Sequence, residues 1–201
     1  MCGGRENHEP KDDGAARSVV SRHALEISVM ITIRPEEEAD RQRILDITRQ
    51  AFESDTEPKL VKRIWKSDDY IPGLSLVAVD DDVVVGHLIF SAMMIETDNE
   101  DIPALCLGPV SVVPERQRQG IGDELIRYGL AECQRMGYHI IVLVGHPEYY
   151  PRFGFRPAGE RGLSMDIEAP PEAFMVYEGI SGALDDVTGK VVFSSAFDGM
   201  T

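Results

Sequence analysis

The chain has 201 residues and a formal net charge of −15, and 43% of its residues are hydrophobic and 27% charged. This composition is ordinary for a globular protein, and the length suits one domain with a substantial core. No apolar run reaches the roughly 18–20 residues that cross a bilayer, which excludes a transmembrane helix. Because a strongly acidic protein repels nucleic acid and anionic membranes, we expect neither as a partner.

The three cysteines, Cys2, Cys106 and Cys133, have no CxxC spacing. Their sparse arrangement argues against a disulfide framework or a zinc site and fits the reducing cytoplasm. Cys106 and Cys133 lie in apolar patterns, so we expect both to be small core residues. The five histidines have no metal-ligand spacing either, and we therefore expect no metal.

Residues 1–29 differ from the rest of the chain. They are polar, contain glycine and show no periodicity, which predicts a disordered N-terminal tail. They lack an apolar core of signal-peptide length. The sequence MITIRP begins at Met30, so we place the start of the domain there and expect it to span residues 30–201. A start codon assigned too far upstream is one explanation for the tail.

Helix and strand signals alternate after Met30. We expect a strand at 31–33, helices at about 37–52 and 57–66, and a hairpin of strands at 74–79 and 83–92. The helical segments place apolar residues three to four positions apart. The acidic triplet that joins the last two strands is typical of a turn.

The alternation continues in the second half of the chain. We expect, in order, a strand at 104–113, a helix at about 120–136, a buried strand at 139–144, a short helical turn at 147–153, and strands at about 173–178 and 190–196. Pro109 removes a ladder hydrogen bond in the first of these strands, which predicts a bulge or splay there. The order of elements indicates an α/β (α+β) fold that combines antiparallel hairpins with at least one parallel crossover.

The strongest motif is VSVVPERQRQGIGDELI, residues 110–126. A strand that ends at Pro114 is followed by a basic turn and by a helix start at 120–122. The first amides of a helix have no internal partner, the helix dipole adds positive charge there, and glycines let a phosphate approach the backbone. Arg116 and Arg118 add positive charge, so this segment predicts an anion-binding site.

Other readings of this segment are weaker or less specific. A dinucleotide-binding GxGxxG motif would need glycine where Leu125 stands, and the GK[ST] of a phosphate-binding P-loop is missing. A helix start whose glycines serve only close packing on a sheet is the alternative that this segment leaves open. Asp123 and Glu124 oppose an anion unless their side chains point away.

A family resemblance favours the anion-binding interpretation. Residues 117–122 match the Q/R-x-x-G-x-G/A signature of the GCN5-related N-acetyltransferase (GNAT) superfamily, and 110–114 resembles the strand before that signature. Residues 149–155, YYPRFGF, resemble the family's Y-x-x-x-G-F segment. The chain looks closest to a bacterial subgroup with a G-x-P-x-Y-Y-x-R-F-G-F segment, and the resemblance covers about residues 30–197.

This resemblance implies a fold and an activity. The fold would be GNAT-like, with a mixed, mostly antiparallel sheet that is splayed between its fourth and fifth strands and with about four helices. By position, those two strands would be 104–113 and 139–144. The activity would be direct transfer of acetyl from acetyl-coenzyme A to an amine of a small molecule or protein, through a ternary complex. A homodimer is common in the family.

The resemblance also implies site residues. Backbone groups of Val110 and Val112 would pair with the pantetheine arm of the cofactor. Tyr150, four residues before Gly154, would be the general acid, with Tyr149 as the alternative. The pyrophosphate would be held by backbone amides of six consecutive residues, namely Gln117, Arg118, Gln119, Gly120, Ile121 and Gly122. The chain departs from many relatives at 145–147, where Gly-His-Pro replaces a pattern with Asn and Ala.

The identity of the general base stays open because strand 104–113 has no carboxylate. The candidates are a base acting through water or one of four side chains, Glu53, Glu57, Glu96 and His146. The segments expected to face the acceptor are about 52–72 and 160–175. Their acidic residues favour a cationic amine, whose identity the sequence does not specify. The missing base also leaves a second hypothesis, a non-catalytic acyl-coenzyme-A-binding or interaction module that keeps the fold.

Overall fold

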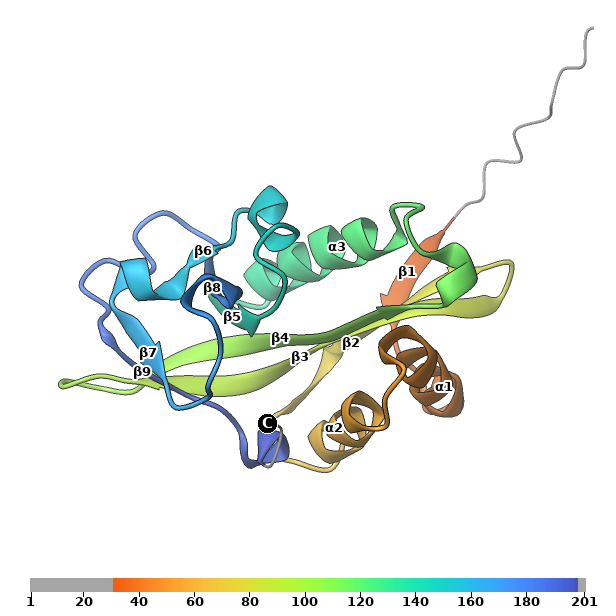
Figure 1. Cartoon of the computed structure of the whole chain (residues 1–201), viewed down its shortest axis with the longest axis horizontal. Coiled ribbons are helices and arrows are strands. Elements are labelled where there is room, and N and C mark those ends of the chain that lie inside the picture. The colour runs from red at the N-terminus through yellow and green to blue at the C-terminus, as the bar shows by residue number, and fades with distance from the viewer. Residues whose placement is uncertain (1–30, 199–201) are drawn as a thin grey trace, which may run out of the picture.

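A computed structural model describes residues 31–198. The tail predicted at 1–29 and the domain start predicted at Met30 lie outside these residues. A single mixed sheet forms the centre of the molecule, with α3 on one face and α1 and α2 on the other (Figure 1). Within the described part of the chain, no helix is both long and apolar enough to cross a membrane.

The elements follow the predicted order closely. The helices are α1 (Arg41–Phe52), α2 (Thr56–Ile64) and α3 (Ile121–Arg135). The strands are β1 (Thr32–Pro35), β2 (Tyr70–Asp80), β3 (Val83–Glu96), β4 (Ile102–Val112), β5 (Ile140–Val144), β6 (Arg156–Pro157), β7 (Leu163–Met165), β8 (Phe174–Glu178) and β9 (Gly189–Val192).

The prediction of about four helices was slightly too high, since residues 31–198 contain three α-helices. The turn expected at 147–153 contains only a 3-10 helix, Tyr150–Phe153. Pro151 brings no amide to this helix, and Gly154 ends it with a left-handed φ of 97°. The short strands β6 and β7 were not predicted because two or three residues show no usable periodicity.

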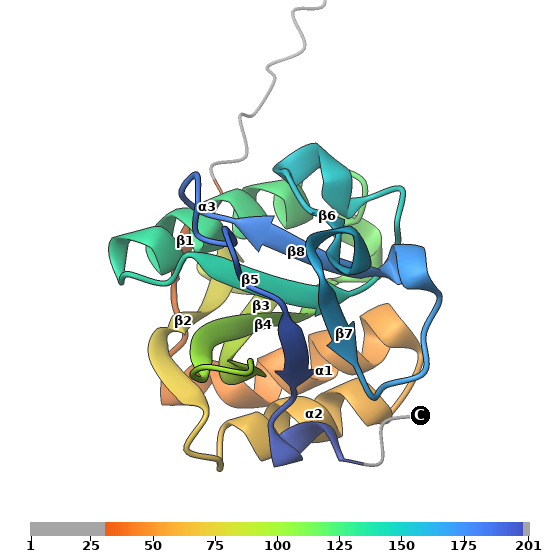
Figure 2. The ribbon, with the colours of Figure 1, turned by 90° about the vertical axis from the view of Figure 1, so that its left-hand side faces the viewer.

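The sheet has the order β1-β2-β3-β4-β5-β8-β6, and β9 pairs with both β3 and β7. Figure 2 shows β8, β5 and β4 one after another across it. The parallel ladder between β4 and β5 consists of two residue pairs, Leu105 with Ile141 and Cys106 with Val142. Beyond Cys106 the two strands share no pairs, which is the splay that the family resemblance implied.

The interruption at Gly108-Pro109 is a β-bulge. On β3, Leu88 pairs with Val110 and Phe90 with Leu107, so two residues of β4 stand opposite one residue of β3. A bulge bends its strand and increases its twist. The predicted irregularity is confirmed, and it lies where β4 leaves β5.

Close packing of α3 fixes the position of its N-terminus. Leu125, Ile126 and Leu130 of α3 are buried in the core. A Cβ atom on Gly129 would lie 2.6 Å from the buried ring of Phe90, so only glycine allows this approach of helix and sheet. The first turn of α3 is therefore held at the mouth of the splay.

A buried polar cluster joins β1, β2, β3 and α2. The carboxylate of Glu36, whose side chain is 2% exposed, accepts hydrogen bonds from Trp65 Nε1 at 3.1 Å, from Tyr70 Oη at 3.0 Å and from Ser75 Oγ. His87 is fully buried, and its Nε2 lies 2.9 Å from Ser75 Oγ. One carboxylate thus satisfies donors from several elements.

We expect Glu36→Gln to lower the free energy of unfolding by about 1–3 kcal/mol, because the amide leaves some of these buried donors without an acceptor. Urea unfolding at neutral pH measures the change. Glu38→Gln is the matched control, since Glu38 is exposed, and it should stay within about 0.5 kcal/mol of the wild type. Equal stabilities of the two variants would contradict the role given to the cluster.

The same cluster makes stability depend on pH. Burial lowers the pKa of His87 below 6.5. Burial alone would raise the pKa of Glu36, but hydrogen bonds from His87, Ser75 and Tyr70 have the larger effect and bring it below 4.5. Below pH 6.5 the folded chain therefore binds fewer protons than the unfolded chain, first at His87 and then at Glu36. Urea unfolding should show that the free energy of unfolding falls between about pH 7 and pH 5. In His87→Gln the free energy of unfolding should depend less on pH. An unchanged pH dependence in that variant would be evidence against His87 as its source.

Candidate active site

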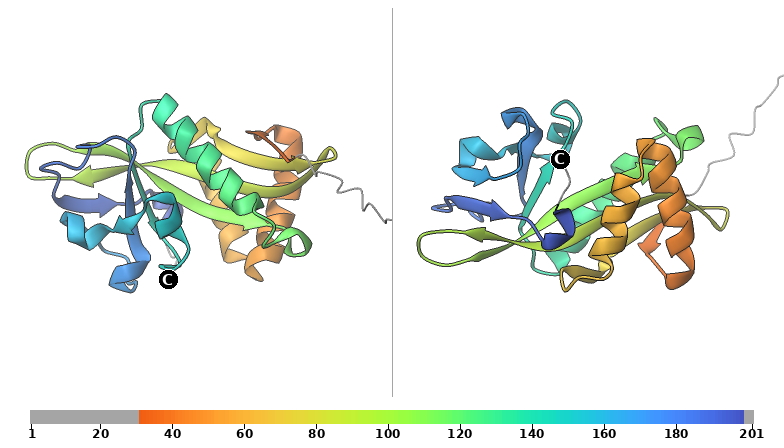
Figure 3. Two further views of the ribbon diagram at one scale, coloured as in Figure 1. Left: turned by 90° about the horizontal axis from the view of Figure 1, so that it is seen from above. Right: turned by 60° about the horizontal axis from the view of Figure 1, so that its bottom comes forward.

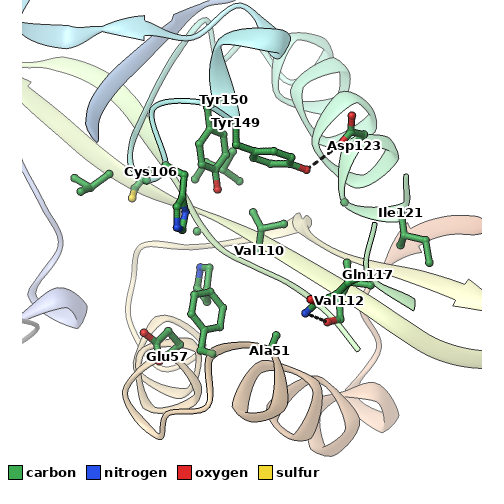
Figure 4. Close-up of a pocket in the computed structure, with 18 of the residues that line it drawn as sticks. Ala51, Glu57, Cys106, Val110, Val112, Gln117, Ile121, Asp123, Tyr149 and Tyr150 are labelled. Carbon is green, nitrogen blue, oxygen red and sulfur yellow. Dashed lines mark hydrogen bonds between the residues drawn. The ribbon is translucent and has the colours of Figure 1, made fainter. Parts of the chain in front are cut away.

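The splay between β4 and β5 opens into a cavity of 1040 Å³. Its walls come from α1 and α2, from β4, from the turn and first residues of α3, from the end of β5 and the loop after it, and from the C-terminal segment. Figure 4 shows this pocket with β4 running through it and helices on both sides. Most of the residues predicted from the sequence to form the site line this cavity.

The main chain of β4 faces the opening at the predicted positions. The amide of Val113 donates to the carbonyl of Val85 on β3 at 2.9 Å. Backbone groups of successive strand residues point to opposite sides, so those of Val112 and Val110 point away from β3 toward the splay. The carbonyl of Val112 accepts a hydrogen bond from Gln117 Nε2 at 3.1 Å. Val110 therefore offers the more accessible backbone groups.

The turn before α3 presents a row of backbone amides. Arg118 and Gly120 have left-handed φ angles of 60° and 89°. The amides of residues 118–120 donate to no carbonyl or side chain within residues 31–198. Those of Ile121 and Gly122 begin α3, where a helix has no internal partners for its amides, and no side chain caps them. This row at a helix N-terminus is suited to binding an anion.

Two of the predicted turn residues contribute differently from expectation. The amide of Gln117 donates to the carbonyl of Pro114 at 3.3 Å, so it is less available to a ligand than the amides that follow. Gln119 does not line the cavity, because its side chain bonds Arg116 Nε at 3.0 Å and the carbonyl of Glu115 at 3.1 Å. The motif could not predict these hydrogen bonds of Gln117 and Gln119, because it specifies residue types but not hydrogen-bond partners.

The charges around the turn favour an anion. Arg116 is paired with Asp80, whereas the exposed side chain of Arg118 has no ion pair or hydrogen bond within the described part of the chain. Asp123, which could have opposed an anion, accepts a hydrogen bond from Tyr149 Oη at 2.8 Å. The guanidinium of Arg152 lies 3.9 Å from the same carboxylate. The local field is therefore more positive than the net charge of the chain suggests.

The two adjacent tyrosines have different surroundings. Tyr149 donates its hydroxyl hydrogen to Asp123, and burial together with this bond raises its pKa. The hydroxyl of Tyr150 points into the pocket near Cys106 (Figure 4). Burial, with a smaller contribution from Cys106, raises the pKa of Tyr150 to about 12. Tyr150 is therefore a protonated phenol facing the cavity at neutral pH.

The thiol of Cys106 lines the cavity but is a poor nucleophile. Burial raises its pKa to about 12, so the thiolate that would attack an acyl group is scarce at neutral pH. Cys133 is buried in the core, as predicted. Within the described residues, no three potential metal ligands gather in one place.

Gly145 explains one departure from the family pattern. A Cβ atom at this position would lie 2.5 Å from Cε2 of Tyr150. The ring of Tyr150 thus occupies the space that any larger residue at position 145 would fill. The sequence alone showed the unusual Gly145-His146-Pro147 but not what the glycine accommodates.

The candidates for a general base divide into two groups. Glu57 and His146 line the cavity, whereas Glu53 and Glu96 do not. Glu53 is exposed at the end of α1, and Glu96 is exposed where β3 meets β9. Glu57 stands out because its Oε2 is buried and has no hydrogen-bond partner among residues 31–198.

Two other acidic residues of the segment expected to face an acceptor are engaged elsewhere. Asp55 pairs with Arg49 at 2.7 Å, and Asp69 accepts a hydrogen bond from Ser194 Oγ. Neither of them lines the cavity. The acidic character of this segment in the sequence therefore overstated the negative charge that an acceptor would meet.

Sequence reasoning missed the C-terminal wall of the cavity. Phe193 and Phe197 line it, and their rings lie 5.5 Å apart between centroids. Arg63 of α2 donates to the carbonyl of Asp198 at 2.7 Å, which holds the C-terminal segment beside α2 (Figure 3). The apolar residues near the C-terminus predicted a strand but no part of a site, because their place in the cavity wall depends on where β9 joins the sheet.

Comparisons with known proteins identify the family of this chain. Residues 32–158 match a family described as an acetyltransferase (GNAT) domain. The chain is 34% identical over 167 residues to the uncharacterized N-acetyltransferase YhbS of Escherichia coli K12, covering 83% of this chain and 98% of YhbS. It is 32% identical over 137 residues to the uncharacterized N-acetyltransferase YjhQ of the same organism, covering 68% of this chain and 76% of YjhQ.

Two crystal structures share the fold. That of E. coli YhbS in complex with CoA matches with a TM-score of 0.79 and 31% identity, covering 87% of this chain and 96% of that one. That of a GNAT family acetyltransferase from Brucella melitensis in complex with acetyl-CoA matches with a TM-score of 0.69 and 33% identity, covering 84% and 99%. The chain belongs to the GNAT acetyltransferase family, which confirms the predicted fold and makes it an acyltransferase.

We expect Gly145→Ala to lower the free energy of unfolding by about 1–3 kcal/mol, because the added methyl group overlaps the ring of Tyr150. Urea unfolding measures the change. Gly159→Ala is the control, since a Cβ atom there meets nothing within 4 Å. In a Tyr150→Ala background the cost of Gly145→Ala should disappear; a cost that persists would show that the two residues do not compete for space.

Proposed function

We propose that this protein transfers acetyl from acetyl-coenzyme A directly to an amine within a ternary complex. The observation that carries the proposal is the row of unpartnered amides at the N-terminus of α3, which opens onto the same cavity as the hydroxyl of Tyr150. The relatives crystallised with CoA and acetyl-CoA support it. The buried, free thiols of Cys106 and Cys133 are consistent with a location in the reducing cytoplasm.

In this proposal the two ends of coenzyme A meet different parts of the cavity. Backbone groups of Val110 and Val112 hold the pantetheine arm beside β4, where β5 no longer pairs. The amides of residues 118–122 hold the pyrophosphate, and Arg118 adds a cation. Each charge-assisted hydrogen bond of this kind contributes about 1.5–3 kcal/mol, so a few of them offset the repulsion from the acidic surface.

The chemistry needs a proton donor for the departing sulfur. Acetyl-coenzyme A supplies the thioester, and Tyr150 donates its phenol proton to the sulfur as the C–S bond breaks. Tyr149 is less suited because its hydroxyl is already bonded to Asp123. Direct attack by the amine fits better than an acyl-enzyme, since the pKa of Cys106 is raised to about 12.

We expect Tyr150→Phe to lower kcat for acetyl transfer about 10²–10⁴-fold and to leave the Kd of acetyl-coenzyme A nearly unchanged. A thiol-release assay with the best substrate from an amine panel gives kcat, and calorimetry gives Kd. Tyr128→Phe is the control, because Tyr128 lies on α3 outside the cavity. A greater loss of kcat in Tyr149→Phe would reassign the acid, and folded protein that fails to bind acetyl-coenzyme A would refute the function.

The same experiment separates the enzyme from a non-catalytic binding module. A module that only binds acyl-coenzyme A would show full affinity for acetyl-coenzyme A and no turnover with any amine. The enzyme is favoured because a protonated phenol is aimed into the cavity and the space for its ring depends on Gly145.

A further inference from the structure

The end of the cavity away from the turn is largely apolar, and among residues 31–198 Glu57 is its single carboxylate. We infer that the acceptor is a small primary monoamine with an aromatic or aliphatic body, and that Glu57 binds its ammonium group and removes its proton. This inference rests on the proposed function and adds the substrate class and the base.

The walls of this end are hydrophobic. They come from α1, α2, the bulge in β4, the loop after β7 and the C-terminal segment. The residues that form them are Phe52, Leu60, Pro109, Ile167, Phe193 and Phe197. Aromatic rings among them suit the body of an aromatic or alkyl amine and stabilise a nearby ammonium through their faces.

The charge inventory of the cavity allows one ammonium group. Glu57 and Asp123 are the only carboxylates that line it within residues 31–198. Asp123 lies at the turn end and is occupied by Tyr149 and Arg152. A polyamine or an aminoglycoside would bring several ammonium groups, and all but one would lose water against apolar walls without a counter-ion, which is costly.

Glu57 is equipped to receive that ammonium group. Its Oε2 is buried and lacks a donor within the described residues, and an ammonium group supplies three donors. Figure 4 shows Glu57 on the α2 side of the pocket and Tyr150 on the opposite side. An amine between them would have its base on one side and the proton donor for the leaving group on the other.

The proton balance closes with these two residues. The ammonium gives one proton to the carboxylate of Glu57, and the freed lone pair forms the C–N bond to the acetyl carbon. The C–S bond breaks, and the sulfur takes the proton of Tyr150. The second proton lost from nitrogen restores the phenol, and Glu57 releases its proton to solvent. Each amide formed therefore yields free coenzyme A and one proton.

A panel of acceptors tests the substrate class. We expect kcat/KM for 2-phenylethylamine and hexylamine to exceed the values for spermidine, kanamycin and a lysine-containing peptide by about tenfold or more, equivalent to at least about 1.4 kcal/mol. A higher kcat/KM for any of the last three would overturn the inference while leaving acetyl transfer itself intact.

Two variants test the charge argument. Phe52 is 40% exposed at the end of α1, so Phe52→Asp adds a second carboxylate, besides Glu57, to the end of the cavity away from the turn with little cost in packing. It should raise the ratio of spermidine to 2-phenylethylamine turnover about tenfold, whereas the neutral control Phe52→Asn should not. Equal ratios in the two variants would refute the charge argument.

Calorimetry separates failure of this inference from failure of the proposed function. The wild type saturated with coenzyme A should bind 2-phenylethylamine, and Glu57→Gln should lose at least about tenfold in that affinity while it binds acetyl-coenzyme A normally. If acetyl-coenzyme A itself fails to bind, the proposed function falls. If it binds and Glu57→Gln binds the amine as well as the wild type does, the role of Glu57 falls alone.

Discussion

The site depends on one constraint, the early end of the ladder between β4 and β5. After Cys106 the backbone of β4 has no strand partner on that side within the described part of the chain, although unpaired backbone groups in a protein interior are costly. Side-chain donors compensate only in part, as Gln117 does at the carbonyl of Val112. The remaining groups can be satisfied by a ligand that runs along the strand. The bulge at Gly108-Pro109 bends β4 at the same point, so the defect in the sheet and the opening of the cavity have one origin.

The position of α3 turns this opening into a site for an anion. Phe90 reaches the helix only because residue 129 is glycine, and this packing holds the first turn of α3 beside the end of β4. The chain is strongly acidic, yet Asp123, the acidic residue of α3 that lines the cavity, is engaged by Tyr149. Under the proposed function, binding of an anion at this point is governed by local amides and by Arg118 rather than by the net charge.

Local sequence patterns predicted the parts of the site that lie within single elements. Proline in the middle of β4 and glycines at the start of α3 carry their structural meaning in a few neighbouring residues, so the bulge and the turn could be placed in advance. The wall formed by Phe193 depends on where β9 joins β3, a contact between distant segments that no local pattern encodes. The partners of Gln119 are only three and four residues away, but the motif specifies residue types and not hydrogen-bond partners. Asp55 is a similar case, since its pairing with Arg49, six residues earlier, engages a charge that the sequence assigned to the acceptor.

The two ends of the cavity have opposite electrostatic character, and this contrast gives the site a direction. Amides and Arg118 gather at the turn, whereas the far end is apolar around Glu57. Burial of Glu57 Oε2 without a donor among residues 31–198 costs stability. The ring of Tyr150, on the other side, restricts position 145 to glycine. A module that only bound coenzyme A would gain nothing from either feature. Their presence on opposite sides of one cavity is explained when a protonated amine occupies the space between them and both groups exchange protons with it.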